Sequence, residues 1–204
     1  KLPFTSVIRE WKELSRFRRL DRRVRSIVFY AEDGGAWVHF ERILSELTGG
    51  MGTPVCYVTS SPNDPVLSGQ DDRILTFCIG FGTARTVLFR TLDADVMVMT
   101  MPDLETFHIK RSPFPVHYVY VHHSIVSTHM VYRPAAFDHF DSILCVGPHH
   151  KEEIRAREKL YKLQEKVLVE HGYGRLESVI DAASVQEASQ QEETGAGKRI
   201  LIAP

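Results

Sequence analysis

The stretch "SIVFYAEDGGAWVHFERILSEL", residues 26–47, contains one apolar run, one glycine turn and one amphipathic segment in that order. The apolar run is rich in β-branched and aromatic residues, which predicts a strand over 26–31. "EDGG" predicts a tight turn, and the apolar spacing after it predicts a helix over 36–47. This unit decides the fold, because the rest of the chain repeats it.

The other apolar runs are mostly uninterrupted rather than alternating, which is typical of strands covered on both faces. Further helices are predicted between them, over 83–92 and 148–162. Strands that alternate with helices predict an α/β fold, a Rossmann-like doubly wound parallel sheet. The remaining strands are predicted over 54–59, 73–80, 95–100, 116–121, 142–147, 166–170 and 199–203.

Composition changes along the chain predict four parts. We expect a basic amphipathic helix over 1–25 and a Rossmann-like domain over 26–180. Residues 181–197 lack aromatic and basic side chains, which indicates a linker. Residues 198–204 form a lone apolar strand, which either completes the first sheet or begins a second α/β domain that is cut short. We expect the second.

The overall composition is that of a soluble globular protein, with 43% hydrophobic and 25% charged residues. No apolar run reaches the roughly 18–20 residues that a membrane-spanning helix needs. The three cysteines have no CxxC spacing and lie in apolar runs, so we expect buried free thiols in a reducing compartment, the cytoplasm.

The N-terminal segment is strongly basic. Residues 1–25 carry nine Lys or Arg and three Asp or Glu, on a chain whose net charge is −1. This asymmetry predicts an anionic partner: lipid headgroups, nucleic acid or a polyphosphate. The helix either packs on the domain with a solvated basic face or lies on a membrane surface; a nucleic-acid arm is the third and least favoured interpretation. Its apolar stripe consists of Phe4, Val7, Ile8, Trp11, Leu14 and Phe17.

Ligands of open α/β sheets bind beyond the carboxyl ends of the strands, where glycine turns allow the backbone to come close. Gly34 and Gly35 follow the first predicted strand, and Gly80 and Gly82 follow the third. Neither turn contains the full GxGxxG pattern, so a plain strand-to-helix turn is the alternative for both.

The fifth predicted strand ends in His122 and His123, followed by Ser124. Neighbouring strand residues point to opposite faces, so the two histidines cannot do the same work. We expect His123 to face the crevice as a general base and His122 to pack behind it. Two packing histidines are the alternative. A metal site with His129 is disfavoured, because no Asp, Glu or Cys lies close by in the sequence to complete a ligand set.

Two later segments carry further polar side chains. In "GPHHKEE", we interpret His149 and His150 as exposed helix residues. In "EHGYGRLES", Arg175 has the planar guanidinium that binds phosphate in a bidentate way. A glycine-rich turn into a helix is the alternative for that segment.

Four segments in this order resemble the CDP-glycerol glycerophosphotransferase family, the teichoic-acid polymerases and primases. "YVHHS" is similar to the family's strand and catalytic histidine, with His123 on that histidine and Ser124 in place of its glycine. "HFDSILCVG" is similar to its FD motif through Phe140 and Asp141. "GYGRLE" is similar to its GYPR-x-D motif, and "LIAP" to the opening of its second domain.

The resemblance implies the N-terminal, acceptor-side half of a two-domain GT-B type fold. It implies transfer of glycerol phosphate, or a related polyol phosphate, from a CDP-linked donor to a lipid-linked or polymeric hydroxyl acceptor, with release of CMP. His123 would be the catalytic base, Gly34, Gly35 and Ser124 would line the acceptor side, and no metal or other cofactor would take part. Arg175 would be a further substrate-binding residue.

The same resemblance implies that a second domain holds most of the nucleotide, so this chain alone would fold but be inactive. It also suits an enzyme at the inner face of the cell membrane, bound through its basic helix and not to nucleic acid. A GT-B glycosyltransferase that uses a nucleotide sugar, a non-catalytic Rossmann-like binding module and a metal-dependent hydrolase are the alternatives.

Overall fold

The computed structural model describes residues 4–69, 71–107 and 109–190. They divide into two compact units, Lys1–Tyr173 and Gly174–Pro204. From the sequence, we expect the domain to end at residue 180. Helix α6 (Gly174–Gln190) starts directly after the boundary between the two units, spans residue 180 and continues into the expected linker. The rest of that linker and the expected strand over 199–203 lie outside the described residues.

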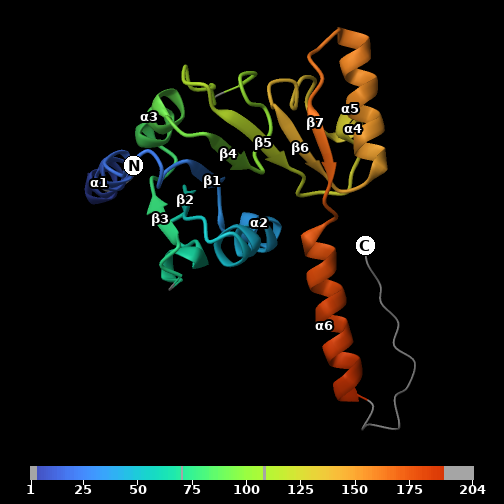
Figure 1. The fold of residues 1–204 in the computed structure, drawn as a ribbon, viewed down its shortest axis with the longest axis horizontal. Helices are drawn as coiled ribbons and strands as arrows, with labels where there is room; N and C mark the ends of the chain where they lie inside the picture. The colour runs from blue at the N-terminus through green and yellow to red at the C-terminus, as the bar shows by residue number, and fades with distance from the viewer. Residues whose placement is uncertain (1–3, 70, 108, 191–204) are drawn as a thin grey trace. The chain divides into compact units, whose positions relative to one another are not determined.

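The first unit is built on one seven-stranded sheet in which every pair of neighbouring strands is parallel (Figure 1). The strand order is β3-β2-β1-β4-β5-β6-β7, the order of a doubly wound Rossmann-like sheet with one strand added. This confirms the predicted fold class. The strands are β1 (Ile27–Ala31), β2 (Val55–Thr59), β3 (Ile74–Cys78), β4 (Val96–Met99), β5 (His117–Val121), β6 (Ser142–Cys145) and β7 (Val167–Glu170).

The predicted helices form where the apolar periodicity places them. The helix predicted over 36–47 is α2, followed by a π-helical turn over Glu46–Gly50, and those predicted over 83–92 and 148–162 are α3 and α5. Short 3₁₀ helices over Gly34–Ala36 and Pro65–Ser68 follow β1 and β2. The α-helices of the first unit are α1 (Phe4–Arg18), α2 (Trp37–Ser45), α3 (Thr83–Thr91), α4 (Thr128–Val131) and α5 (Pro148–Tyr161).

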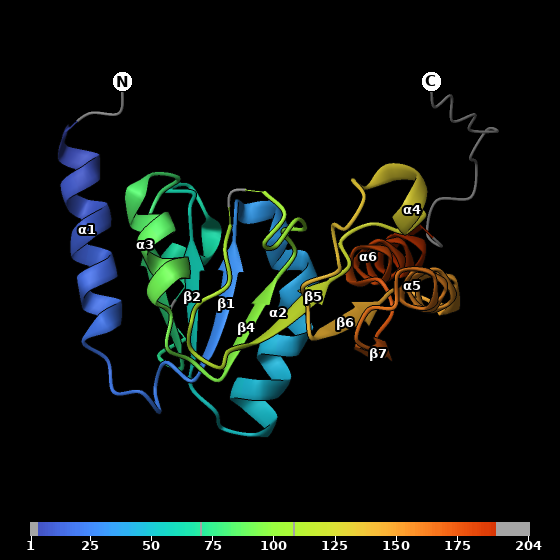
Figure 2. The ribbon, with the colours of Figure 1, turned by 90° about the horizontal axis from the view of Figure 1, so that it is seen from above.

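Two apolar cores cover the two faces of the sheet. Alternate strand residues such as Val28 and Tyr30 join the core that contains side chains of α1, α3 and α5. Their neighbours Phe29 and Ala31 join the other core, which contains α2. Figure 2 shows α1 and α3 together beside β2 and β1, away from α2. The uninterrupted apolar strands follow from this burial on both faces.

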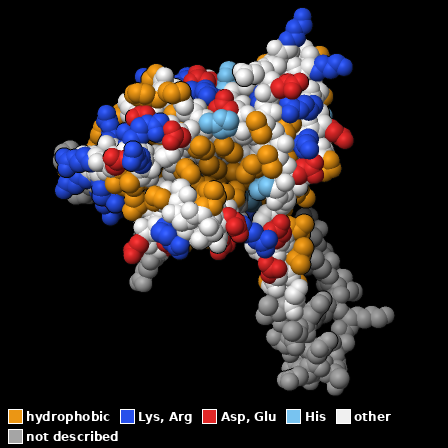
Figure 3. All heavy atoms as spheres, in the orientation of Figure 1, with side chains coloured by type: hydrophobic (Ala, Val, Ile, Leu, Met, Phe, Trp, Pro, Cys, Tyr) orange, Lys and Arg blue, Asp and Glu red, His pale blue; other side chains and the backbone are white. Residues whose placement is uncertain are grey.

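The face that α2 covers is open toward β7. Val167 and Val169 of β7 are 57% and 44% exposed, and Val119 of β5 and Leu144 of β6 are only partly buried. Figure 3 shows hydrophobic side chains gathered over β5 and its neighbours. The central strands are therefore covered on both faces, whereas the last strand is covered on one.

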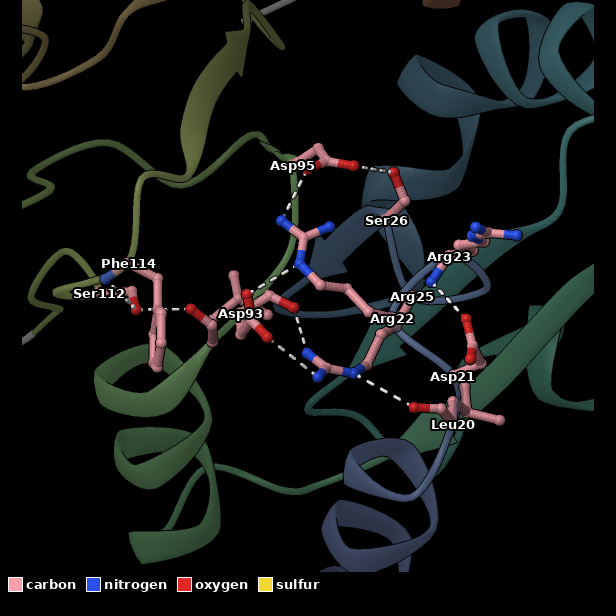
Figure 4. Close-up of polar contacts among 11 residues, drawn as sticks. Leu20, Asp21, Arg22, Arg23, Arg25, Ser26, Asp93, Asp95, Ser112 and Phe114 are labelled. Carbon is pink, nitrogen blue, oxygen red and sulfur yellow. Dashed lines mark hydrogen bonds and ion pairs between the residues drawn. The ribbon is translucent and has the colours of Figure 1, made fainter.

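Part of the basic N-terminal segment is structural. Arg22 pairs with Asp93 at 3.0 Å and with Asp95 at 2.7 Å, and Arg25 pairs with Asp93 at 3.1 Å (Figure 4). Ser26, directly before β1, donates to the same Asp95. These contacts tie the segment after α1 to the residues before β4, so Arg22 and Arg25 are engaged with the domain itself.

Helix α1 packs on the domain with one part of its apolar stripe. Leu14 and Phe17 are 1% and 2% exposed in the first core, whereas Ile8 and Trp11 are 42% and 41% exposed. Among the described residues, no helix is both long and apolar enough to cross a membrane.

The glycine after β3 lets α1 come close to the sheet. Gly80 has φ +64°, and a Cβ there would lie 2.3 Å from Oε1 of Glu10, a side chain of α1 that is 9% exposed. Gly52 has nearly the same φ, +65°, with open space around it. The two glycines share a backbone conformation and differ in what lies beside them.

We predict that Gly80→Ala destabilises the protein more than Gly52→Ala. In both variants alanine must adopt a left-handed backbone conformation, which lowers the free energy of unfolding by about 1–2 kcal/mol. Only Gly80→Ala must also displace the buried Glu10 carboxylate. Urea unfolding measures both losses.

The extra loss should disappear when both substitutions are compared in a Glu10→Ala background, because the atoms that collide with the new methyl group are then absent. Equal losses for the two glycine variants in the wild-type background would contradict this account of the α1 contact.

Candidate functional site

The strand order creates a crevice between β1 and β4. The chain leaves β1 toward β2 on one side and leaves β4 toward β5 on the other, so the connections diverge beyond the carboxyl ends of these two strands. Residues 32–35 follow β1, residues 100–103 follow β4, and residues 122–124 follow β5, which is next to β4. Segments far apart in sequence therefore meet at one edge of the sheet.

The turn after β1 is shaped by a carboxylate and by close packing. Asp33 Oδ1 accepts a hydrogen bond from the backbone N–H of Gly35 at 2.8 Å and caps the 3₁₀ helix. A Cβ at Gly34 would lie 2.8 Å from Cδ of Pro65, so this glycine is required by the neighbouring 3₁₀ helix Pro65–Ser68. Gly34 thus has a structural reason beside the substrate-lining role expected from the sequence.

His123 is half-buried at this edge. Its Nδ1 lies 3.2 Å from the hydroxyl of Tyr120 in β5. Burial lowers the pKa of His123, and the Thr100 carbonyl and the charge of Asp33 counter this only in part. The imidazole is therefore neutral at pH 7, the form that accepts a proton.

Aromatic side chains surround His123, and of these only Tyr173 belongs to a motif quoted from the sequence, "GYGRLE". The His39 ring, from α2, lies 6.2 Å from the His123 ring and stacks on Tyr173 at 5.7 Å. The Tyr173 hydroxyl donates to the His123 carbonyl oxygen at 3.2 Å, and the Tyr132 ring lies 6.3 Å from the His123 ring. The sequence did not indicate that His39 and Tyr132 belong to the site, because neither lies in a segment that resembles a functional motif.

His122 points into the first core. It is 0% exposed, and its ring lies 3.9 Å from that of His150 and 5.2 Å from that of Phe137. In the part of the chain that the structure describes, neither ring nitrogen of His122 has a hydrogen-bond partner. Burial lowers the pKa of His122 to about 2, helped by the neighbouring histidines. His122 is a neutral packing residue.

The expectation that His149 and His150 are both exposed is wrong for His150, which is 0% exposed. His150 Nδ1 accepts from the Val146 N–H at 3.4 Å, so its Nε2 donates to the Val126 carbonyl at 2.9 Å. His149 is exposed, and its Nε2 lies 3.2 Å from the Ile125 carbonyl. The first turn of α5 thus binds the loop after His123 through these two histidines. The apolar spacing that predicts the helix does not predict this contact.

The other predicted residues lie as follows. The Ser124 hydroxyl accepts from the Val126 N–H at 3.4 Å, within the loop that follows His123. Arg175 is the second residue of α6 and belongs to the second unit. His129 lies against Ser127 and Glu153 rather than against His123. The described residues contain no group of three side chains suited to a metal ion.

We predict that His122→Phe makes the protein less sensitive to acid. The unfolded chain protonates this histidine below its ordinary pKa of 6.5, whereas the folded chain resists protonation down to about pH 2. The free energy of unfolding that this difference contributes is fully present above pH 6.5. Below pH 6.5 it falls by about 1.4 kcal/mol for each unit by which the pH is lowered. Urea unfolding between pH 7 and pH 4 measures the slope.

Phenylalanine removes this titration and breaks no hydrogen bond that the structure shows, so the variant should lose less stability between pH 7 and pH 4. His139→Phe, at an exposed position, is the control and should keep the wild-type slope. An unchanged slope in His122→Phe would mean that His122 is not buried as a neutral ring.

The site thus brings His123 together with the Gly34–Gly35 turn, Asp33, His39 and Tyr173. Comparison with protein-family models, with curated proteins and with solved structures finds no match to this chain. The case for a function consequently depends on the chemistry of these side chains.

Proposed function

We propose that the chain is the acceptor-side domain of a transferase of the CDP-glycerol glycerophosphotransferase type, with His123 as the general base. The observation that supports this most is the half-buried imidazole at the carboxyl edge, next to the crevice between β1 and β4. Burial keeps it neutral, and the Tyr120 hydroxyl orients it. A neutral, oriented imidazole at this place in an open α/β sheet suits proton removal from a bound hydroxyl group.

The proposed reaction is a phosphoryl transfer. His123 takes the proton of the acceptor hydroxyl while that oxygen forms a bond to the phosphorus atom that carries glycerol. The bond from this phosphorus to the oxygen of CMP breaks, and CMP leaves. The imidazolium then returns its proton to solvent. Positioning of the two substrates supplies most of the rate enhancement in such a reaction.

The resemblance divides the substrates between two domains. Gly34, Gly35 and Ser124 would line the acceptor side near His123, and a second domain would hold most of the CDP-linked donor. Arg175 would meet a phosphate group. The substrate-lining roles of Gly34, Gly35 and Ser124 and the phosphate contact of Arg175 are parts of this proposal, as is the transfer reaction.

We further propose that the domain works at the inner face of the cell membrane. Trp11 and Ile8 are exposed on α1, and Arg9 and Lys12 are exposed on the same helix. Aromatic and aliphatic side chains beside arginine and lysine suit the interface of an anionic bilayer. Leu14 and Phe17 meanwhile keep the helix on the domain.

We predict that His123→Ala lowers CMP release from CDP-glycerol roughly 10²–10⁴-fold, the usual contribution of a general base. The assay uses the protein at its natural length with a lipid-linked acceptor. His139→Ala, which changes an exposed histidine, is the control and should keep wild-type activity. The acid limb of the wild-type pH profile should lie below 6.5, the ordinary pKa of a histidine.

Asp33→Asn should move this acid limb to still lower pH, because it removes a charge that raises the pKa of His123. CMP release that survives His123→Ala would refute the assignment of the base. Turnover of a nucleotide sugar in place of CDP-glycerol would identify a glycosyltransferase. Absence of turnover with both donors would favour a binding module.

We predict that Trp11→Ala weakens binding to vesicles of phosphatidylglycerol and phosphatidylcholine several-fold in a sedimentation assay, since it removes an exposed aromatic anchor. Leu160→Ala is the matched control, because Leu160 is a 72% exposed apolar residue of α5. Equal binding of wild type and both variants would rule out α1 as the membrane contact.

A further inference from the structure

A pocket of about 430 Å³ opens beyond the carboxyl ends of β1 and β4, on the side toward α3. Residues after β1, residues after β4, the start of α3 and the loop after α4 all contribute to its wall. Tyr132 lines this pocket, and its ring lies 6.3 Å from the His123 ring. The hydroxyl of Tyr120, in β5, lies 3.2 Å from His123 Nδ1. Tyr132 is thus the side chain that the pocket wall and the surroundings of the candidate base have in common.

Two arginines enter this pocket from different segments. Arg85 is 17% exposed, and its Nη1 lies 3.5 Å from Glu32 Oε1, while its Nε is buried without a partner among the described residues. The Arg133 guanidinium is exposed and lies 4.7 Å from the centre of the Phe107 ring. The guanidinium of Arg133 thus lies over the Phe107 face, and its N–H groups can bind a planar or tetrahedral anion.

The same wall carries two carboxylates and an apolar surface. Glu32 and Asp103 line the pocket, and burial raises the pKa of Glu32. Met101, Ile109 and the 52% exposed Phe107 supply the apolar part. Guanidinium groups bind phosphate oxygens, carboxylates accept hydrogen bonds from hydroxyl groups, and apolar side chains pack on C–H faces. This combination fits a phosphorylated polyol or sugar better than a bare anion.

We propose that this pocket, the Arg85–Arg133 pocket, binds a phosphate ester of a hydroxylated compound. Arg133 and Arg85 hold the phosphate, and Glu32 and Asp103 accept from its hydroxyl groups. Its further role as the acceptor site, which presents a hydroxyl to His123 past Tyr132, depends on the function proposed above. The binding itself depends only on the residues of the pocket.

Calorimetry on the chain tests the binding, with glycerol 3-phosphate, inorganic phosphate and glycerol as probes. We expect glycerol 3-phosphate to bind more tightly than inorganic phosphate and glycerol not to bind. Arg133→Gln should weaken the glycerol 3-phosphate complex roughly 10–100-fold, the usual loss for a hydrogen-bonded charge. Arg90→Gln changes an exposed arginine on the last turn of α3 and should leave the affinity unchanged.

Arg85→Gln should weaken binding too, but Arg85 also contacts Tyr30 and Glu32, so its variant requires a check of thermal stability. Arg133 is exposed, so Arg133→Gln is the variant whose affinity for glycerol 3-phosphate tests the proposal. Equal affinity of wild type and Arg133→Gln, or no binding of glycerol 3-phosphate by wild type, overturns the proposal. So does an equal loss in Arg90→Gln, which would indicate general charge attraction.

The acceptor role has a separate readout. In the CMP-release assay, Arg133→Gln should raise the KM for the acceptor and change kcat little. Binding lost in the variant with an unchanged KM would refute the acceptor role and leave a ligand site of another purpose. Binding of glycerol 3-phosphate without any CMP release by the wild-type protein at its natural length would refute the proposed transferase, and the binding pocket would still be confirmed.

Discussion

The site depends on one constraint, the parallel pairing of all strands in the sheet. Parallel pairing puts every carboxyl end on one edge, and the order β1-β4-β5 puts the ends of three distant segments side by side. Asp33, Thr100 and His123 meet for this reason. The central strands can supply such a rigid edge because apolar side chains cover both of their faces.

The two adjacent histidines show how the same backbone gives unlike chemistry to like side chains. His122 turns into a core with no hydrogen-bond partner among the described residues and behaves as a packing ring. His123 turns to the edge, where a hydroxyl orients it and a carboxylate moderates the effect of burial. The alternation of β5 continues into the two residues that follow it, because the His122 N–H still bonds to the Leu144 carbonyl, and it directs one ring inward and the next outward. Local burial then decides which ring can exchange a proton with a ligand.

The sequence predicts the strands, the main helices and the fold class, because each depends on local apolar periodicity. It does not predict what depends on contacts between distant segments. The need for Gly34 comes from Pro65, and the burial of His150 comes from the loop at Val126. Arg22 and Arg25 look like part of a free basic arm until Asp93 is seen beside them. The Arg85–Arg133 pocket draws its wall from several loops and has no motif at all. The transferase role stays a prediction, since neither periodicity nor packing tests it.

The pairing of β1 with β4 also has a consequence for synthesis on the ribosome. β1 can pair with β2 as soon as Thr59 has emerged, but its other edge must wait until the chain has been made through Met99. During this interval, the nascent chain can hold only a three-stranded sheet, β3-β2-β1, in which β1 is an edge strand with an open edge. The early α1, which packs against β3 through Phe17 and Phe77, covers one face of that intermediate before β4 arrives. The N-terminal helix therefore covers part of one face of the growing sheet, while the edge of β1 stays open until β4 has been made.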